Sequence, residues 1–176
     1  MVISLLHHFL LKYSGGVSEM TLNADNCVGQ NKNNSVLQYL MWRVATRMNS
    51  SVELTFMVAG HTKLSPDYGF GIFKRVYRNA DVNSIEDVCN LMNRSNLLIA
   101  EPVGTERGDV LIPCYDWQSK FESLGKVSGI KQLHHFAFDA YTQRRTWTSK
   151  LPGNSFVHMS HWFWFLETER VMVQKY

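Results

Sequence analysis

The fold of this chain is decided by the stretch MTLNADNCVGQNKNN, residues 20–34. Its first part, Met20–Ala24, is a short apolar run typical of a strand, and it ends directly before the carboxylate of Asp25. A polar turn then opens a long amphipathic segment. In open α/β sheets, the carboxyl ends of strands and the N-termini of helices face one crevice, where ligands bind. The sequence therefore predicts a ligand site around Asp25.

The segments that follow predict a strand–helix–strand unit. Apolar residues recur at i, i+3, i+4 and i+7 over residues 35–48, which is the spacing of a helix with one buried face. Asn33 or Asn34 can cap this helix by accepting a backbone N–H group. An apolar, β-branched run from Val52 to Ala59 predicts a second strand, parallel to the first in the same sheet.

Further helices are predicted on either side of this unit. The apolar run over residues 2–11 predicts a buried helix, which is too short to span a bilayer and lacks the features of a signal peptide. After the second strand, a helix is predicted to begin at Ser65 or Pro66 and to continue through Tyr77. A further helix is predicted over residues 84–92, with Ser84 as its N-cap.

The last third of the chain is richer in aromatic residues. Residues 109–115 and 134–148 alternate partly between apolar and polar positions, which predicts a small β region. The run SHWFWFL at 160–166 is too apolar to remain in water, so we expect it to cover an apolar surface. The predicted division is a core over residues 1–108 and a β-rich extension of the same domain over residues 109–176.

Composition and charge narrow the class of protein. The chain has 176 residues, of which 45% are hydrophobic, and this suits one globular domain. A net charge of +3 is too small to indicate nucleic-acid binding by itself. The cysteines, Cys27, Cys89 and Cys114, are far apart, which favours free thiols in a reducing compartment over disulfides or structural zinc.

Acidic side chains at the two predicted strand ends are the candidates for catalysis. Asp25 follows the first strand, and Asp67 opens the helix after the second, so both would face one crevice. Two carboxylates that approach each other closely are what Mg²⁺ or Mn²⁺ needs, and a metal ion held in this way suits phosphoryl transfer. The alternative is that either aspartate is simply a helix cap.

Polar side chains around these strand ends could contact a phosphate backbone. The candidates for nucleic-acid binding are Gln30, Asn31, Lys32, Asn33, His61 and Lys63. Ordinary loop and capping chemistry is the alternative for each of them, although His61 could also serve as a ligand or a general acid. The sequence contains no nucleophile elbow, Walker motif or dinucleotide-binding glycine pattern.

Several motifs together resemble one known family. They are ADNCVGQNKNN at 24–34, LQYLMWR at 37–43, GHT at 60–62 and PDYGFG at 66–71. The string D-N-C-x-G-Q-N-K-N is long and unusual, and G-H-T-x-x-x-P-D follows it at the expected spacing. The chain thus resembles the domain of unknown function 7869, whose members are similar to proteins of DNA transposons, and the resemblance weakens after about residue 115.

This resemblance implies the ribonuclease-H-like fold of integrases and transposases, an α/β fold in which acids on the first strand, the fourth strand and a later helix hold two divalent metal ions. By the resemblance, Asp25 is the fourth-strand acid and Asp67 the helix acid, with Mg²⁺ or Mn²⁺ as cofactor and DNA as partner. The first acid has no counterpart here. We therefore expect a partial ribonuclease-H-like fold that starts at its first core helix and lacks the first three strands. The strand before Asp25 would then have an unpaired edge. With one metal-binding acid missing, we expect the chain to cleave DNA weakly or not at all.

Two other functions fit the sequence. The chain could bind nucleic acid or protein without catalysis, through the cations of Lys32, Arg43, Lys63, Lys74, Arg75 and Arg78. It could also be an unrelated metal-dependent hydrolase whose third acidic ligand is Glu101, Glu106 or Asp109. The predicted location is intracellular, with the nucleus as one option. No membrane association is expected, and the sequence leaves open whether the chain forms a homo-oligomer.

Overall fold

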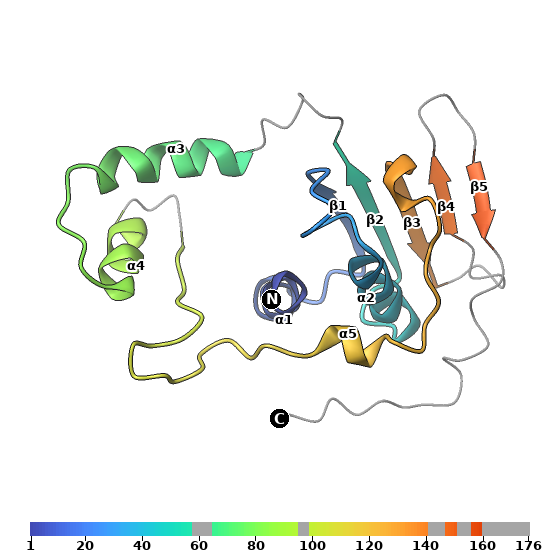
Figure 1. The fold of residues 1–176 in the computed structure, drawn as a ribbon, viewed down its shortest axis with the longest axis horizontal. Helices are drawn as coiled ribbons and strands as arrows, with labels where there is room; N and C mark the ends of the chain where they lie inside the picture. Colours follow the sequence, from blue (N-terminus) through green and yellow to red (C-terminus); the bar gives the residue numbers. More distant parts are fainter. Residues whose placement is uncertain (58–64, 95–98, 141–146, 151–155, 160–176) are drawn as a thin grey trace.

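Two parallel strands joined by a helix form the centre of the structure (Figure 1). Strand β1 (Glu19–Ala24) leads through the polar loop to helix α2 (Asn34–Ala45), which returns the chain to strand β2 (Ser51–Phe56). The two strands pair in parallel, with Glu19 opposite Ser51 and Ala24 opposite Phe56. The predicted strand–helix–strand unit is confirmed. The structure is a computed structural model, and it describes residues 1–57, 65–94, 99–140, 147–150 and 156–159.

Helix α2 is held at both ends by its own sequence. The Asn33 side chain accepts a hydrogen bond from the Val36 amide, which is the predicted N-cap. At the other end, the Arg43 carbonyl accepts from the Met48 amide, and Arg47 adopts a left-handed φ of 59°. This is a Schellman motif with arginine in place of the usual glycine. The helix therefore ends at Ala45, before the predicted Met48.

Three antiparallel strands extend the sheet beyond β2, in the order β1-β2-β3-β4-β5. They are β3 (His135–Asp139), β4 (Trp147–Lys150) and β5 (Phe156–Met159). Because β3 pairs directly with β2, the predicted C-terminal β region continues the same sheet. Strand β1 lies at the opposite edge, where the described residues pair it with β2 only.

Residues 109–115 differ from the prediction, because they form no strand. Their one ladder contact is an isolated bridge between Gly104 and Val110, and Pro113 lacks the N–H group that a ladder would use. A Cβ atom at Gly104 would lie 2.9 Å from the Asp109 carbonyl oxygen, so this turn requires glycine. The aromatic run at 160–166 lies outside the described residues.

The core lies between the sheet and helices α1 (Val2–Tyr13), α2 and α5 (Trp117–Lys120). Every residue of α2 from Val36 to Val44 is buried. Helix α1 is buried on one side only, because Leu10 faces the core whereas Phe9 and Leu11 are exposed. The prediction of a helix here is confirmed, but the prediction that it is buried holds for one face. A 3-10 turn, η1 (Ile130–Gln132), precedes β3.

Helices α3 (Ser65–Tyr77) and α4 (Ile85–Asn93) pack against each other beside the sheet, at the left of Figure 1. Helix α3 begins at Ser65, as predicted. Ser84 caps α4 as predicted, since its side chain and that of Asp87 form a reciprocal capping box. None of the described helices has the length and apolar character needed to cross a bilayer.

Candidate functional site

Asp25 lies directly beyond the carboxyl end of β1, as predicted, and its carboxylate is held in one orientation. The Oδ1 atom accepts hydrogen bonds from the Cys27 amide at 3.1 Å and from Asn31 Nδ2 at 2.6 Å. Among the described residues, no donor contacts Oδ2. The side chain is half-buried, so the second oxygen is the free one. The Asp25 carboxylate is thus held in one direction, with one oxygen anchored and the other open.

The neighbouring Asn26 and Lys32 tie this loop to the rest of the sheet. Asn26 Nδ2 donates to the Met57 carbonyl at the end of β2, at 2.8 Å. Lys32 Nζ donates to Asn26 Oδ1 at 2.8 Å and to the carbonyl of Lys131 at 3.0 Å. The ammonium group also lies 5.2 Å from the centroid of the Phe56 ring. Lys32 therefore connects three segments of the chain: the loop after β1, the end of β2 and η1.

Burial decides the role of Lys32. The residue is only 2% exposed, and this burial lowers the pKa of its ammonium group. A lysine enclosed in this way cannot reach a phosphate in solvent without breaking both hydrogen bonds. The sequence predicts Lys32 as a nucleic-acid contact, whereas its position in the structure favours a structural role.

Most of the other polar side chains of the motif form hydrogen bonds within the protein, and one is exposed to solvent. Asn33 caps α2, and its Nδ2 donates to the Gln30 carbonyl at 3.0 Å. Asn34 Oδ1 accepts from the Val127 amide at 2.6 Å, which fixes the segment before η1. Asn31 orients Asp25, as described above. Gln30 is exposed, and no described residue forms a hydrogen bond with its side chain, so this predicted contact residue is available to a partner.

Asp67 occupies the first turn of α3 along the chain, but its side chain lies outside what the structure describes, as do His61 and Lys63. A shared ion between Asp25 and Asp67 is therefore still a prediction. The described residues contain no group of three His, Cys, Asp or Glu side chains able to hold a metal ion. Asp25 Oδ2 and the amide oxygen of Asn31 are hard oxygen donors that suit Mg²⁺ or Mn²⁺, so this corner fits part of such a site.

Comparison with protein families agrees with this arrangement of motifs. The family model described as Domain of unknown function (DUF7869) matches residues 1–151. The chain belongs to this family. The match covers every described element from α1 to β4, so it extends past residue 115, where we expect the resemblance to weaken from the sequence. No curated protein and no solved structure matches the chain significantly.

Two of the three carboxylates proposed for an unrelated hydrolase, Glu101 and Asp109, make other contacts in this DUF7869 domain. Glu101 forms an ion pair with Lys12 and a hydrogen bond of 3.3 Å with His8 Nε2, both on α1. The Lys12 ammonium lowers the pKa of the Glu101 carboxyl group to about 2. Asp109 accepts from Thr105 Oγ1 at 2.9 Å within its own turn. Glu101 therefore connects the segment after α4 to α1, a contact between residues 89 positions apart that no local pattern predicts.

A second predicted phosphate contact, Arg43, is also buried. It is 3% exposed, and its guanidinium donates to Asn49 Oδ1 at 2.8 Å and to the Tyr39 hydroxyl at 3.1 Å. Asn49 in turn donates to the Val17 carbonyl at 2.8 Å. No carboxylate among the described residues pairs with Arg43. Its position, like that of Lys32, favours a structural role, and it connects α2 to the start of β1.

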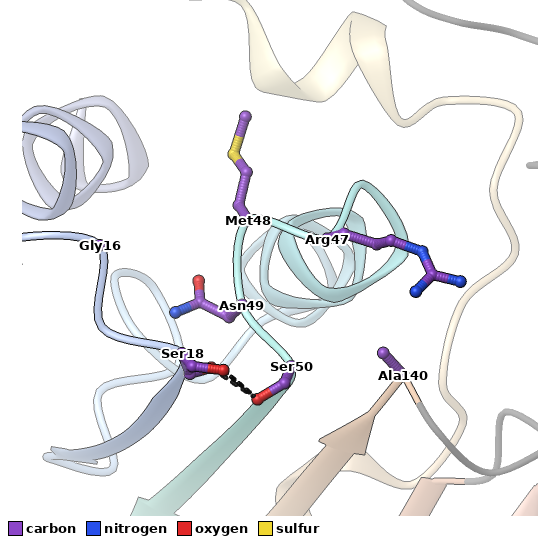
Figure 2. Close-up of a pocket in the computed structure, with 7 residues that line it drawn as sticks. All are labelled: Gly16, Ser18, Arg47, Met48, Asn49, Ser50 and Ala140. Carbon is purple, nitrogen blue, oxygen red and sulfur yellow. Dashed lines mark hydrogen bonds between the residues drawn. The ribbon is translucent and has the colours of Figure 1, made fainter.

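A hollow of about 180 Å³ lies at the amino ends of β1 and β2, at the opposite end of these strands from Asp25. Figure 2 shows the lining side chains, with Arg47 extending away from Ser18 and Asn49. The hydroxyl groups of Ser18 and Ser50 lie 2.6 Å apart and hydrogen-bond to each other. The two serine hydroxyls pair with each other, and Asn49 is held by Arg43 and the Val17 carbonyl, so these polar groups are already engaged. Asp25 is therefore the better candidate.

Proposed function

We propose that this DUF7869 chain is a transposase-derived, ribonuclease-H-like domain whose chemistry is metal-dependent cleavage or strand transfer of DNA phosphodiesters. The observation that carries the proposal is the Asp25 carboxylate at the carboxyl end of two parallel strands, with Oδ1 anchored and Oδ2 free. Carboxylates in this position collect ligands in α/β sheets. Family membership supports the proposal, because the motif around Asp25 is the one that carried the resemblance.

In this proposal Asp25 and Asp67 would hold Mg²⁺ or Mn²⁺, which would supply Lewis-acid activation of the phosphodiester. Asn31 keeps the Asp25 carboxylate from rotating, and so fixes the direction of its free oxygen. Gln30, which is exposed at the same loop, is placed to meet a phosphate or a base. Since the first acid of the resembled arrangement has no counterpart, we expect weak cleavage or none.

The test is a DNA cleavage assay with the full chain in Mg²⁺ and in Mn²⁺, with Mn²⁺ binding measured in parallel. Asp25→Asn and Asp67→Asn should each remove any cleavage and weaken Mn²⁺ binding. The matched control is Asp81→Asn, because Asp81 is exposed and lies before α4. This substitution should change neither DNA cleavage nor Mn²⁺ binding. Cleavage or Mn²⁺ binding that survives Asp25→Asn unchanged would contradict the proposal.

The second candidate function is binding of nucleic acid without catalysis. Its support comes from α3, where Lys74, Arg75 and Arg78 are all exposed, whereas Lys32 and Arg43 are buried. A salt titration separates this function from an ordinary solvated helix face. Contacts to phosphates predict that affinity falls steeply as salt rises, and an affinity that does not respond to salt would reject this function.

A further inference from the structure

Helix α3 exposes large aromatic side chains that the rest of the described structure does not cover. Phe70 is 57% exposed and Tyr77 is 45% exposed. The helix packs on α4 through another of its faces, because Gly69 is buried and Ile72 and Phe73 are half-buried. Exposed aromatic rings that gather on one face of a protein commonly mark a binding surface.

Four residues of α3 lie on one face because of their spacing. Phe70, Lys74, Tyr77 and Arg78 stand at i, i+4, i+7 and i+8, so they form one stripe along the helix. The rise of a helix places the two aromatic residues about 10 Å apart along its axis, with Lys74 between them. The centroid of the Phe73 ring lies 5.5 Å from that of the Tyr77 ring, so the two rings pack against each other. We call this surface the α3 stripe.

The charge of the α3 stripe is uniformly positive. No acidic residue occurs from Tyr68 to Ala80, and among the described residues neither Lys74 nor Arg78 forms an ion pair. These two cations are therefore available to an anionic partner. A protein partner would need an acidic and apolar surface in matching register, whereas a single nucleic-acid strand supplies both a regular row of phosphates and flat apolar bases.

We propose that the α3 stripe binds single-stranded DNA, with bases stacked on Phe70 and Tyr77 and phosphates bound by Lys74 and Arg78. Stacking on exposed rings requires unpaired bases, since the bases of a duplex are already stacked on each other. The proposal takes the choice of DNA from the function proposed above, but it needs neither Asp25 nor a metal ion. The α3 stripe would bind a strand without taking part in chemistry.

The experiment measures the affinity of the full chain for a fluorescent oligothymidine of about 20 nucleotides, in EDTA, over a series of salt concentrations. Phe70→Ala with Tyr77→Ala should weaken binding by at least about 10-fold, because each stacked base contributes appreciably to affinity. The dependence of log affinity on log salt should stay the same in this variant. The matched control is Tyr68→Ala, which removes an aromatic residue that is 74% exposed on the opposite side of α3 and should leave affinity unchanged.

The two cations should show the reverse behaviour. Lys74→Gln with Arg78→Gln should reduce the salt slope by about 0.7 for each lost phosphate contact. Lys126→Gln, at an exposed lysine in another part of the structure, should leave the slope unchanged. Thermal unfolding of each variant should match that of the unmodified chain, since all four stripe residues are exposed.

Three outcomes would overturn the inference. The unmodified chain could fail to bind oligothymidine, or it could bind a DNA duplex as tightly as the single strand. The third outcome is that the Phe70→Ala, Tyr77→Ala variant binds oligothymidine as tightly as the unmodified chain. Asp25→Asn should bind oligothymidine normally in EDTA. A chain that binds the strand but never binds Mn²⁺ would therefore contradict the proposed catalysis alone, and a chain that binds Mn²⁺ through Asp25 but not the strand would contradict this inference alone.

Discussion

The buried imidazole of His7 predicts a loss of stability at acidic pH. His7 is 4% exposed on α1, and its ring contacts those of Tyr39, Trp42, Tyr115 and Trp117. Its Nδ1 lies 3.1 Å from the Tyr39 hydroxyl. That hydroxyl already accepts a hydrogen bond from Arg43, so it is placed to donate its own proton to a neutral His7.

Protonating His7 in the folded protein is therefore unfavourable. Burial, with smaller contributions from the charges of Arg43, Lys120 and His8, lowers its pKa from 6.5 to about 4. The unfolded chain takes up the proton near pH 6.5, whereas the folded protein resists it down to about pH 4. The stability due to neutral His7 is complete above pH 6.5 and is lost as the pH falls to about 4, which amounts to about 3 kcal/mol.

The assay is urea denaturation followed by tryptophan fluorescence between pH 7 and pH 4. His7→Gln can still accept from the Tyr39 hydroxyl but does not titrate, so it should remove most of the slope in this window. The matched control is Leu10→Ala on the same helix, which is expected to lower stability at every pH and keep the slope. NMR titration of the His7 ring gives a second reading. A ring that titrates near pH 6.5 in the folded protein would refute this account.

The loop beside Asp25 gives three further predictions. Lys32→Met should lower the free energy of unfolding by about 1–3 kcal/mol in urea, because it removes two hydrogen bonds made by a buried side chain and leaves their partly buried acceptors unpaired. Lys126→Met, at an exposed site, should change it by less than about 0.5 kcal/mol, and equal effects of the two substitutions would argue against a structural role of Lys32. Asn33→Ala should cost about 1 kcal/mol of stability in the same assay through loss of the α2 cap, and no loss would show that the cap is dispensable. Asn31→Ala should weaken Mn²⁺ binding in a calorimetric titration by about 10-fold or more, since it releases the Asp25 carboxylate, and unchanged affinity would separate Asn31 from the metal site.

The longer helices, the caps of α2 and α4 and the two parallel strands are predicted correctly from the sequence, because they depend on residues close together in the chain. The apolar spacing of α2, its Asn33 cap and the capping box of α4 each involve residues within a few positions of one another. The parallel pairing of β1 with β2 followed from the helix between them. The carboxylate of Asp25 was placed correctly at a strand end for the same reason.

Contacts between distant segments explain what the sequence could not predict. Lys32 was expected in solvent because lysine is rarely buried, and its burial depends on a carbonyl of η1 that lies 99 residues further along the chain. Arg43 is enclosed through Asn49 and the loop before β1. The pairing of β3 with β2 also spans the whole of α3 and α4. A single sequence carries no signal for such distant partners. The polar residues of the motif are therefore predicted as phosphate contacts, although Lys32 is buried.

We propose that the polar motif after β1 positions Asp25 so that its free oxygen can hold a divalent metal ion. The most direct test is a Mn²⁺ titration of the full chain and of Asp25→Asn, followed by electron paramagnetic resonance. We expect that Mn²⁺ binds the unmodified chain and that Asp25→Asn weakens binding by about 10-fold or more, whereas Asp81→Asn has no effect. Equal Mn²⁺ affinity in the unmodified chain and in Asp25→Asn would contradict it.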